Sequence, residues 1–336
     1  MKKSFFQKIV DVMKVRDFAR AGSVARLATL GLVMLLMGLP AVAKDQYLLV
    51  GSIASNDILR YDANTGAFAG VLIPSGTGGM GQPQSMTIGP DGNLYIGSGS
   101  NILEFDSQTG KFLETFVSDS QMGQPIGLNF GPDGNLYVSD PGAHDGSKVF
   151  RFDGKTGASM GVFATTEPSE RNPGFIGSAW GPDGDLYVAM GWDGYVAHFD
   201  GATGARLANL STPEIEYGNG AMFGPDGLLY VSDYWIGEVE VYDIHTGTHV
   251  KTLDGGMYGA ANMEFRDDGS LLVASVFTDH IFEFKSGSDS PTVFAAASSP
   301  YALVLSAVPE PSTYIMLLAG SCLLGFMARR RKESVI

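Results

Sequence analysis

Aromatic side chains stand beside carboxylates at two places in this 336-residue sequence. Trp192 precedes Asp193, and Tyr234 and Trp235 follow Asp233. An aromatic face stacks on a sugar ring while a neighbouring carboxylate hydrogen-bonds its hydroxyls, and the same groups suit a hydrophobic contact with a protein. The two segments therefore predict a binding surface. The alternative is that the rings fold over the loops and cover the ends of strands.

A third polar segment contains Asp140, His144 and Asp145 and predicts a cation site. For Asp140 and Asp233 the alternative is that an aspartate at the end of a strand caps its own loop. Apart from weak calcium binding, we expect no cofactor.

The sequence lacks the familiar motifs of catalytic sites. It has no nucleophile elbow, no paired-carboxylate motif, no phosphate-cradling glycine loop with a lysine, and no zinc-ligand spacing. The one cysteine, Cys322, lies near the C-terminal end, so the preceding body of the chain has no thiol chemistry. We therefore predict no catalytic residue and, apart from the weak cation site above, no metal site.

The charge of the chain is unevenly distributed. Of 22 basic and 36 acidic residues, 11 basic and 4 acidic ones lie outside residues 44–308, which leaves a body with a net charge of −21. So acidic a body repels nucleic acid and anionic lipid, and we expect neither as a partner.

A four-residue phrase, Gly-Pro-Asp-Gly, recurs along this body, with a degenerate copy at 266–269. Its aspartates are Asp91, Asp133, Asp183, Asp226 and Asp268. They are 42, 50, 43 and 42 residues apart, and Asp45 occupies the same column of a sixth repeat. A second turn, Asp-x-x-Thr-Gly, recurs between them, in which aspartate caps the turn and glycine supplies a positive φ. Four short strands in each repeat of 40 to 50 residues predict an all-β fold, a six-bladed β-propeller over residues 44–308.

The first repeat lacks its inner strand, and the end of the body supplies one. Residues 300–306 align with residues 125–131 without a gap. We therefore expect a C-terminal strand to pair into blade one and to close the ring, leaving no open edge. The two recurrent turns then share one face of the propeller. The loops that differ among repeats, including the aromatic and polar segments above, lie on the other face, where we expect a ligand.

The two ends of the chain carry export signals. Residues 1–43 combine a basic region, an apolar run and a small-residue cleavage site, which is typical of a secretory signal peptide. The other end of the chain is residues 309–336. It begins, directly after Val308, with Pro309, Glu310 and Pro311 and continues with an apolar stretch and a basic cluster. This order resembles the PEP-CTERM sorting signal, which implies cleavage by an exosortase and release or re-anchoring at the cell surface. The alternative is an ordinary membrane anchor; in either case the membrane is contacted only through the tail.

The repeats resemble NHL and gluconolactonase-like propellers, through Gly-Pro-Asp-Gly-x-Leu-Tyr-Val-Ser-Asp at 131–140 and 224–233. Gluconolactonase-like enzymes hold a divalent metal with inner-strand glutamate, asparagine and aspartate. In each repeat the corresponding position is seven residues before the turn aspartate. Asn219 occupies this position and Asn262 lies one residue after it, but no carboxylate accompanies them there. The streptogramin lyases use histidine and glutamate; His144 and His280, in variable loops, have no partner spacing, and His198 has a structural role inside a strand.

These observations predict an exported, non-enzymatic propeller that binds a carbohydrate or a protein partner. Extracellular polysaccharide is one candidate, because the PEP-CTERM resemblance implies a link to exopolysaccharide production. A metal-dependent lactonase or hydrolase is the alternative.

Overall fold

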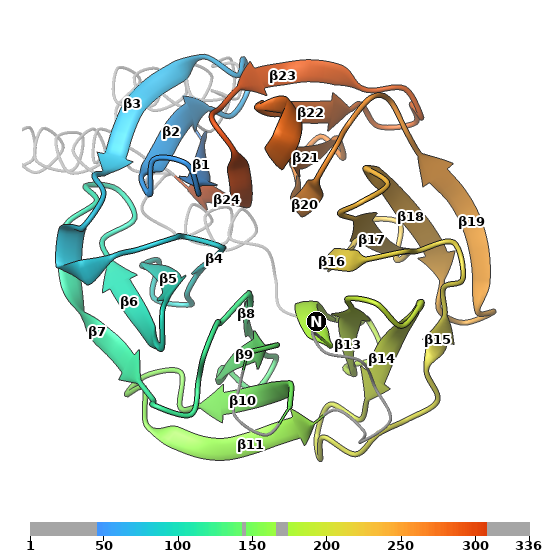
Figure 1. Cartoon of the computed structure of the whole chain (residues 1–336), viewed down its shortest axis with the longest axis horizontal. Coiled ribbons are helices and arrows are strands. Elements are labelled where there is room, and N and C mark those ends of the chain that lie inside the picture. The colour runs from blue at the N-terminus through green and yellow to red at the C-terminus, as the bar shows by residue number, and fades with distance from the viewer. Residues whose placement is uncertain (1–45, 143–145, 166–173, 308–336) are drawn as a thin grey trace, which may run out of the picture. The chain divides into compact units, whose positions relative to one another are not determined.

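A computed structural model describes residues 46–142, 146–165 and 174–307. Within them, 24 strands form six four-stranded antiparallel sheets that stand around a central axis as the blades of a propeller (Figure 1). The fold class predicted from the repeats is confirmed. The predicted signal peptide and the sorting tail lie outside the described residues.

Each blade runs from an inner strand at the axis to an outer strand at the rim. Blade one consists of β24 (Pro300–Ala307), β1 (Gln46–Ser52), β2 (Ile58–Asp62) and β3 (Phe68–Ile73). Blade two consists of β4 (Ser85–Ile88), β5 (Leu94–Ser98), β6 (Asn101–Phe105) and β7 (Phe112–Ser118). Blade three consists of β8 (Gly127–Phe130), β9 (Leu136–Asp140), β10 (Lys148–Phe152) and β11 (Ser159–Thr165). Blade four consists of β12 (Phe175–Trp180), β13 (Leu186–Met190), β14 (Tyr195–Phe199) and β15 (Leu210–Ser211). Blade five consists of β16 (Gly218–Phe223), β17 (Leu229–Asp233), β18 (Glu238–Asp243) and β19 (Thr248–Leu253). Blade six consists of β20 (Ala260–Phe265), β21 (Leu271–Ser275), β22 (His280–Phe284) and β23 (Thr292–Ala296).

The Gly-Pro-Asp-Gly turn joins the first two strands of a blade. In blade three the amide of Gly134 donates to the carbonyl of Gly131 at 2.9 Å, and Gly134 has a φ of 79°, which favours glycine. The Asp133 carboxylate accepts hydrogen bonds from the Asn135 amide and the Tyr137 hydroxyl, each at 3.0 Å. The turn is therefore fixed by its own side chains, which explains why it recurs.

The Asp-x-x-Thr-Gly turn joins the third and fourth strands. In blade three Asp153 accepts hydrogen bonds from the Thr156 hydroxyl and amide, each at 2.9 Å, and from the Lys155 amide at 3.0 Å. The hydrogen bond from the Thr156 hydroxyl is the main reason that the pKa of Asp153 lies below its ordinary value.

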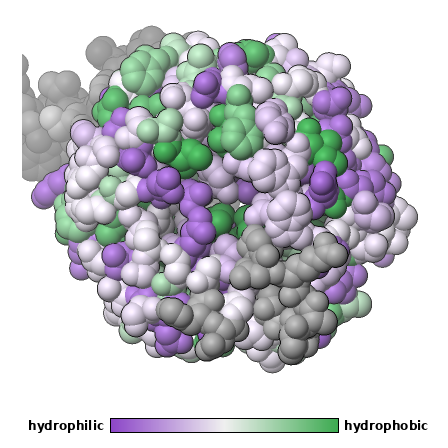
Figure 2. All heavy atoms as spheres, viewed as in Figure 1, coloured by the Kyte–Doolittle hydropathy of each residue, from purple (hydrophilic) through white to green (hydrophobic). Residues whose placement is uncertain are grey.

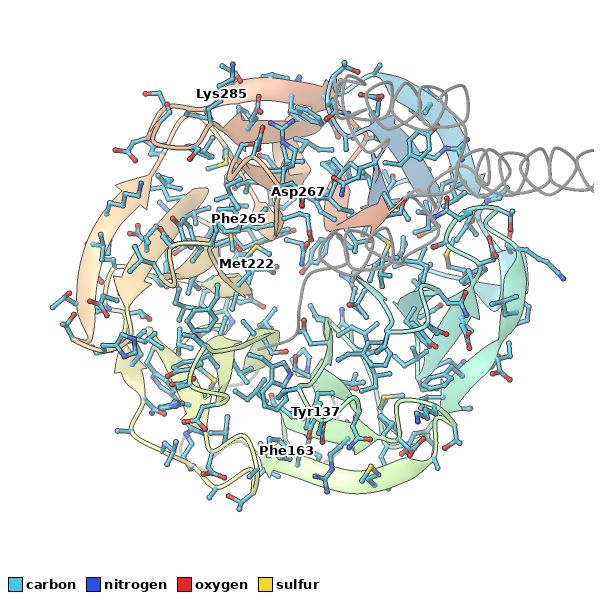
Figure 3. The ribbon with its side chains drawn as sticks, turned by 180° about the vertical axis from the view of Figure 1, so that it is seen from behind. Tyr137, Phe163, Met222, Phe265, Asp267 and Lys285 are labelled. Carbon is cyan, nitrogen blue, oxygen red and sulfur yellow. The ribbon has the colours of Figure 1, made fainter. Side chains whose placement is uncertain are left out.

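Aromatic side chains pack between neighbouring blades near the turn face; Figure 3 views this face and labels Tyr137 and Phe163 of blade three. Tyr137 of blade three packs edge-to-face on Trp180 of blade four, with ring centroids 4.8 Å apart, and on Phe163 at 4.9 Å. Equivalent pairs join other blades: Tyr95 with Phe130, Tyr187 with Phe223, and Tyr230 with Phe265. In blades two to six every residue of the second strand is buried, so the core lies between the sheets.

The ring closes in blade one, where both ends of the described chain meet. Strand β24 pairs antiparallel with β1, and Leu305 lies opposite Leu48. The Ser52 hydroxyl adds a hydrogen bond of 2.7 Å to the Ser298 carbonyl. The prediction that a C-terminal strand completes blade one is confirmed, and the first and last strands lie side by side in Figure 1.

Candidate binding surface on the loop face

Three consecutive blades present an aromatic ring at the same position on the loop face. Trp192, Trp235 and Phe277 each lie two residues after the end of a second strand, in blades four, five and six. The ring centroids of Trp192 and Trp235 are 6.4 Å apart at an interplanar angle of 28°, and those of Trp235 and Phe277 are 6.3 Å apart at 15°. The three side chains are 38%, 40% and 48% exposed. They form a row of nearly parallel rings open to solvent.

Tyrosine rings surround this row. Tyr217 packs edge-on against Trp192 at 4.7 Å, and Tyr258 lies 4.9 Å from Phe277. Tyr234 packs edge-on against Phe277 at 5.3 Å. We call this set the aromatic platform: Trp192, Tyr217, Tyr234, Trp235, Tyr258 and Phe277. Figure 2 views the loop face, where ring-shaped side chains gather over β16 and β20 on one side of the centre.

A buried carboxylate fixes the centre of the platform. Asp233 is 1% exposed, and one of its oxygens accepts hydrogen bonds from the amides of Trp235 and Ile236 at 2.9 and 3.0 Å. The other oxygen accepts from the amides of Glu216 and Tyr217. Asp233 therefore ties two loops together beneath their aromatic residues, and it does not present its carboxylate to solvent.

Asp140 does the same in blade three, where the loops carry no aromatic ring within the described residues. It is fully buried and accepts hydrogen bonds from the amides of Gly123, Gln124 and Gly142. Both aspartates thus cap loops, as the alternative interpretation of the sequence had it. His144 and Asp145, the other members of the predicted cation site, lie outside the described residues.

Asn219 and Asn262, which the sequence placed at or next to the metal-ligand column of gluconolactonase-like enzymes, join inner strands of different blades. Asn219 donates to the Tyr301 hydroxyl at 2.8 Å, and both residues are buried. The Asn262 side-chain oxygen accepts a hydrogen bond from the Leu303 amide at 3.1 Å. Asp193, beside Trp192, is half-buried. The structure therefore brings Trp192, Tyr234 and Trp235 together on one surface but keeps Asn219 and Asn262 beneath it.

A cavity of about 120 Å³ lies in the central channel, between the inner strands. Its lining includes Asn129, Asn262 and Glu264. Burial raises the pKa of Glu264 to about 8, and no hydrogen bond or ion pair of this carboxyl is found among the described residues. Glu264 is therefore largely protonated at neutral pH.

Sequence reasoning missed three of these residues. Phe277 and Tyr258 have no carboxylate next to them in the sequence, so the pairing of aromatic residue and carboxylate did not indicate them, although Phe277 shares the repeat position of Trp192 and Trp235. Glu264 lies four residues before Asp268, outside the position seven residues before each turn aspartate at which a metal-binding carboxylate was expected. His280, expected in a loop, is the first residue of β22, and its Nδ1 faces the Thr278 carbonyl.

Comparison with known proteins settles the nature of the C-terminal end. Residues 307–332 match the PEP-CTERM protein-sorting motif. The chain is a six-bladed propeller with a PEP-CTERM sorting motif. This motif implies export, processing by an exosortase and sorting to the cell surface. No curated protein matches the sequence of this PEP-CTERM propeller.

Solved structures share the propeller fold at low sequence identity. A protein of unknown function from Bacteroides caccae and a chain of a nidogen/laminin complex each have a TM-score of 0.64 and 14% identity, cover 78% of this chain, and are themselves covered over 99% and 98% of their length. A catalytically inactive virginiamycin B lyase from Staphylococcus aureus, solved with quinupristin, has a TM-score of 0.54 and 13% identity over 76% of this chain and 87% of its own. These likenesses support the fold. Among the described residues of the PEP-CTERM propeller, no helix is long and apolar enough to cross a membrane.

Proposed function

We propose that this exported protein is a non-enzymatic propeller that binds a carbohydrate on the aromatic platform. The observation that carries the proposal is the row of exposed, nearly parallel rings of Trp192, Trp235 and Phe277, which come from three consecutive blades. Exposed aromatic groups in a contiguous patch mark binding sites more often than scattered ones do. The platform spans several blades and therefore suits a chain of sugar units.

The spacing of the rings restricts how a ligand lies on them. A sugar held between two rings requires two contact distances of about 3.5–4.0 Å, or about 7–8 Å in all. The centroid separations of 6.3 and 6.4 Å are too short for this arrangement. A ligand therefore lies across the exposed side of the row, in contact with successive rings.

The charge of the body restricts the chemistry of the glycan. A net charge of −21 over residues 44–308 repels polyanions, so the proposal favours a neutral polysaccharide over one rich in uronate or sulfate. Burial raises the pKa of Tyr217 and of Tyr234, so both hydroxyls stay protonated and act as hydrogen-bond donors to sugar oxygens.

A glycan array and a polysaccharide pull-down with the full chain, kept soluble in mild detergent, test the proposal. Trp192→Ala and Trp235→Ala are expected to lose binding with an unchanged melting temperature. Phe68→Ala is the control, because Phe68 is 60% exposed but lies on the outer strand β3. If no glycan binds, or if all three variants bind like the parent, the carbohydrate assignment fails. The platform could instead bind a surface protein, with binding lost in the same two variants. The ligand would then be a protein partner, which the rings suit equally well.

A metal-dependent lactonase is a second candidate, and Glu264 is the observation in its favour. It lines the channel cavity together with Asn262 and Asn129, so a carboxyl and two amides border the same space. A calcium-dependent rise in melting temperature together with lactone turnover, both lost in Glu264→Gln, would support this candidate. Absence of lactone turnover at high calcium would contradict this candidate and leave carbohydrate binding as the proposed function.

A further inference from the structure

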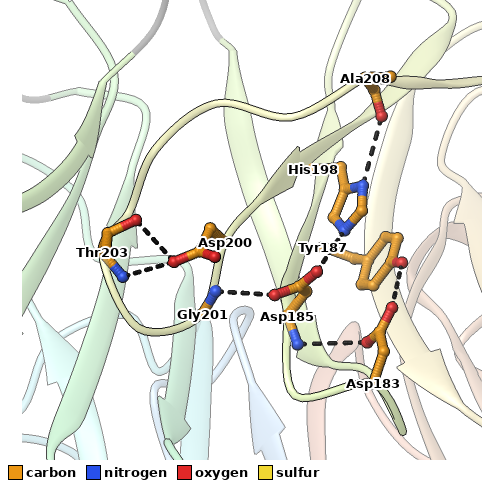
Figure 4. A network of polar contacts seen from close by, with 8 residues as sticks. All are labelled: Asp183, Asp185, Tyr187, His198, Asp200, Gly201, Thr203 and Ala208. Atoms are coloured by element: carbon orange, nitrogen blue, oxygen red, sulfur yellow. Dashed lines mark hydrogen bonds and ion pairs between the residues drawn. The ribbon is translucent and has the colours of Figure 1, made fainter.

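A cluster of two carboxylates and an imidazole lies on the turn face of blade four (Figure 4). It consists of Asp183 in the Gly-Pro-Asp-Gly turn, Asp185 just after the turn, and His198 on β14. One ligand atom of each residue lies within 4.8 Å of the others. Asp185 and His198 are partly exposed and Asp183 is exposed, so an ion in solution has access to all three.

The two hydrogen-bond partners of His198 favour a proton on one ring nitrogen. Its Nδ1 lies 3.3 Å from the Ala208 carbonyl oxygen, which only accepts, so Nδ1 is the donor. Its Nε2 lies 3.1 Å from an oxygen of Asp185. In the neutral imidazole this second nitrogen carries a lone pair, and that lone pair faces a carboxylate. A metal ion bound by both groups makes this contact favourable; the other arrangement that satisfies it is the tautomer in which Nε2 carries the proton and donates to Asp185.

Outer hydrogen bonds orient each of the three side chains. The Tyr187 hydroxyl donates to one oxygen of Asp183 at 2.8 Å, and the Gly201 amide donates to one oxygen of Asp185 at 2.9 Å. The ring of His198 stacks on that of Tyr187, with centroids 4.3 Å apart at 12°. A histidine that binds a metal through one nitrogen and donates to a carbonyl through the other is a common arrangement in metal sites.

Corresponding positions of other blades lack this combination. The residue at the position of Asp185 is Asn93 in blade two, Asn135 in blade three and Leu228 in blade five. Asn93 there bonds to Glu104 at 2.6 Å, and no imidazole takes part. Within the described part of the chain, no second group of three such ligands is found. The cluster is therefore not required by the repeat itself.

We propose that Asp183, Asp185 and His198 bind a divalent transition-metal ion such as Zn²⁺. Nitrogen and carboxylate ligands suit Zn²⁺, whereas Ca²⁺ takes six to eight oxygens. Three protein ligands leave a further position for water. The bound ion links β14 to the turn between β12 and β13, and so ties the turn face of blade four together.

Titration calorimetry of the full chain in mild detergent, made without a polyhistidine tag, tests the site with Zn²⁺ alone. One Zn²⁺ per chain is expected, with a higher melting temperature in its presence. His198→Phe keeps a ring that stacks on Tyr187 and is expected to abolish binding, as is Asp185→Asn. Tyr187→Phe removes only an outer hydrogen bond and is expected to weaken binding about 10- to 100-fold. Co²⁺ in place of Zn²⁺ is expected to give visible absorption bands that these variants lose.

His249→Phe is the matched control. His249 also lies beside a carboxylate, with its Nε2 2.6 Å from an oxygen of Glu240, and beside a tyrosine ring, that of Tyr242. This variant is expected to bind Zn²⁺ like the parent. Binding that survives both His198→Phe and Asp185→Asn, or that is lost equally in His249→Phe, overturns the assignment. Absence of Zn²⁺ binding overturns it too, and leaves the contact of Asp185 and His198 as a hydrogen bond between two side chains only.

Discussion

Asn219 of blade five donates a hydrogen bond of 2.8 Å to the hydroxyl of Tyr301, which lies 82 residues further along the chain in blade one. Both side chains are buried just beneath the aromatic platform, and the Tyr301 ring lies 6.2 Å from that of Tyr234. The bond spans the axis side of blade six, and so connects the closing strand to the platform. The strand that completes the ring is thus also part of the support for the proposed binding surface.

Tyr301→Phe tests this connection. The variant removes the acceptor of the Asn219 amide and leaves a buried donor without its partner, which costs about 1–3 kcal/mol of unfolding free energy. Urea denaturation measures this loss. Asn219→Ala, combined with Tyr301→Phe, is expected to cost less than the sum of the two single changes, because both remove the same bond. Additive effects would show that the two side chains act independently.

Removal of residues 300–307 tests closure of the ring. Without β24, the inner edge of β1 loses its hydrogen-bonding partner, and Leu48 and Val50, both fully buried, are exposed. The shortened chain is expected to aggregate, because an unpaired strand edge with apolar side chains recruits other strands. Size-exclusion chromatography and thermal melting measure the outcome. A monomer with the parent's melting temperature would contradict the role given to β24.

Asp233→Asn tests whether the platform depends on its buried carboxylate. The amide side chain cannot accept at both ends, so the amides of Glu216 and Tyr217, or those of Trp235 and Ile236, lose their acceptor. Hydrogen bonds to a charged group contribute about 1.5–3 kcal/mol, so both stability and ligand affinity are expected to fall.

Asp140→Asn is the control for that change. It breaks the same kind of loop cap in blade three, away from the platform, and is expected to lower the melting temperature while ligand affinity is kept. Equal affinity in the two variants would show that the platform does not need the cap of blade five. Melting curves and glycan binding at a temperature well below both transitions separate the two effects.

The propeller was predictable because its signals are local. A turn aspartate followed by glycine fixes backbone geometry within four or five residues, as Asp153 and Gly157 do, and five copies of each turn, one of them degenerate, reveal the repeat. Closure was predictable for the same reason, since residues 300–306 match the inner strand of another repeat. Each of these inferences needed only the comparison of short segments along the chain.

The site was less predictable because it depends on side-chain direction and on register. The sequence alone does not show whether the Asp233 carboxylate faces solvent or the backbone amides of the loop that follows it. Counting residues back from a turn assumes regular strands, but β20 has a bulge between Ala260 and Met263, which shifts the pairing next to Asn262 and Glu264. The contact between Asp185 and His198 joins the residue before β13 to the neighbouring strand β14, and no spacing motif describes it.

Glu264 makes the stability of the propeller dependent on pH. Burial raises its folded-state pKa to about 8, above an ordinary value of 4.5, so the folded protein holds a proton that the unfolded chain releases between these values. The stability associated with this proton is fully present below pH 4.5 and is lost as the pH rises toward 8. The free energy of unfolding is therefore expected to fall with pH over this window, by up to about 1.4 kcal/mol per pH unit.

Glu264→Gln stays neutral at every pH and is expected to remove this fall, which makes the variant more stable than the parent at pH 8. Urea denaturation at pH 5 and pH 8 measures the difference, with Glu216→Gln, at an exposed loop position, as the control. A parent and a Glu264→Gln variant that lose the same stability between these two pH values would place the Glu264 carboxyl in contact with water.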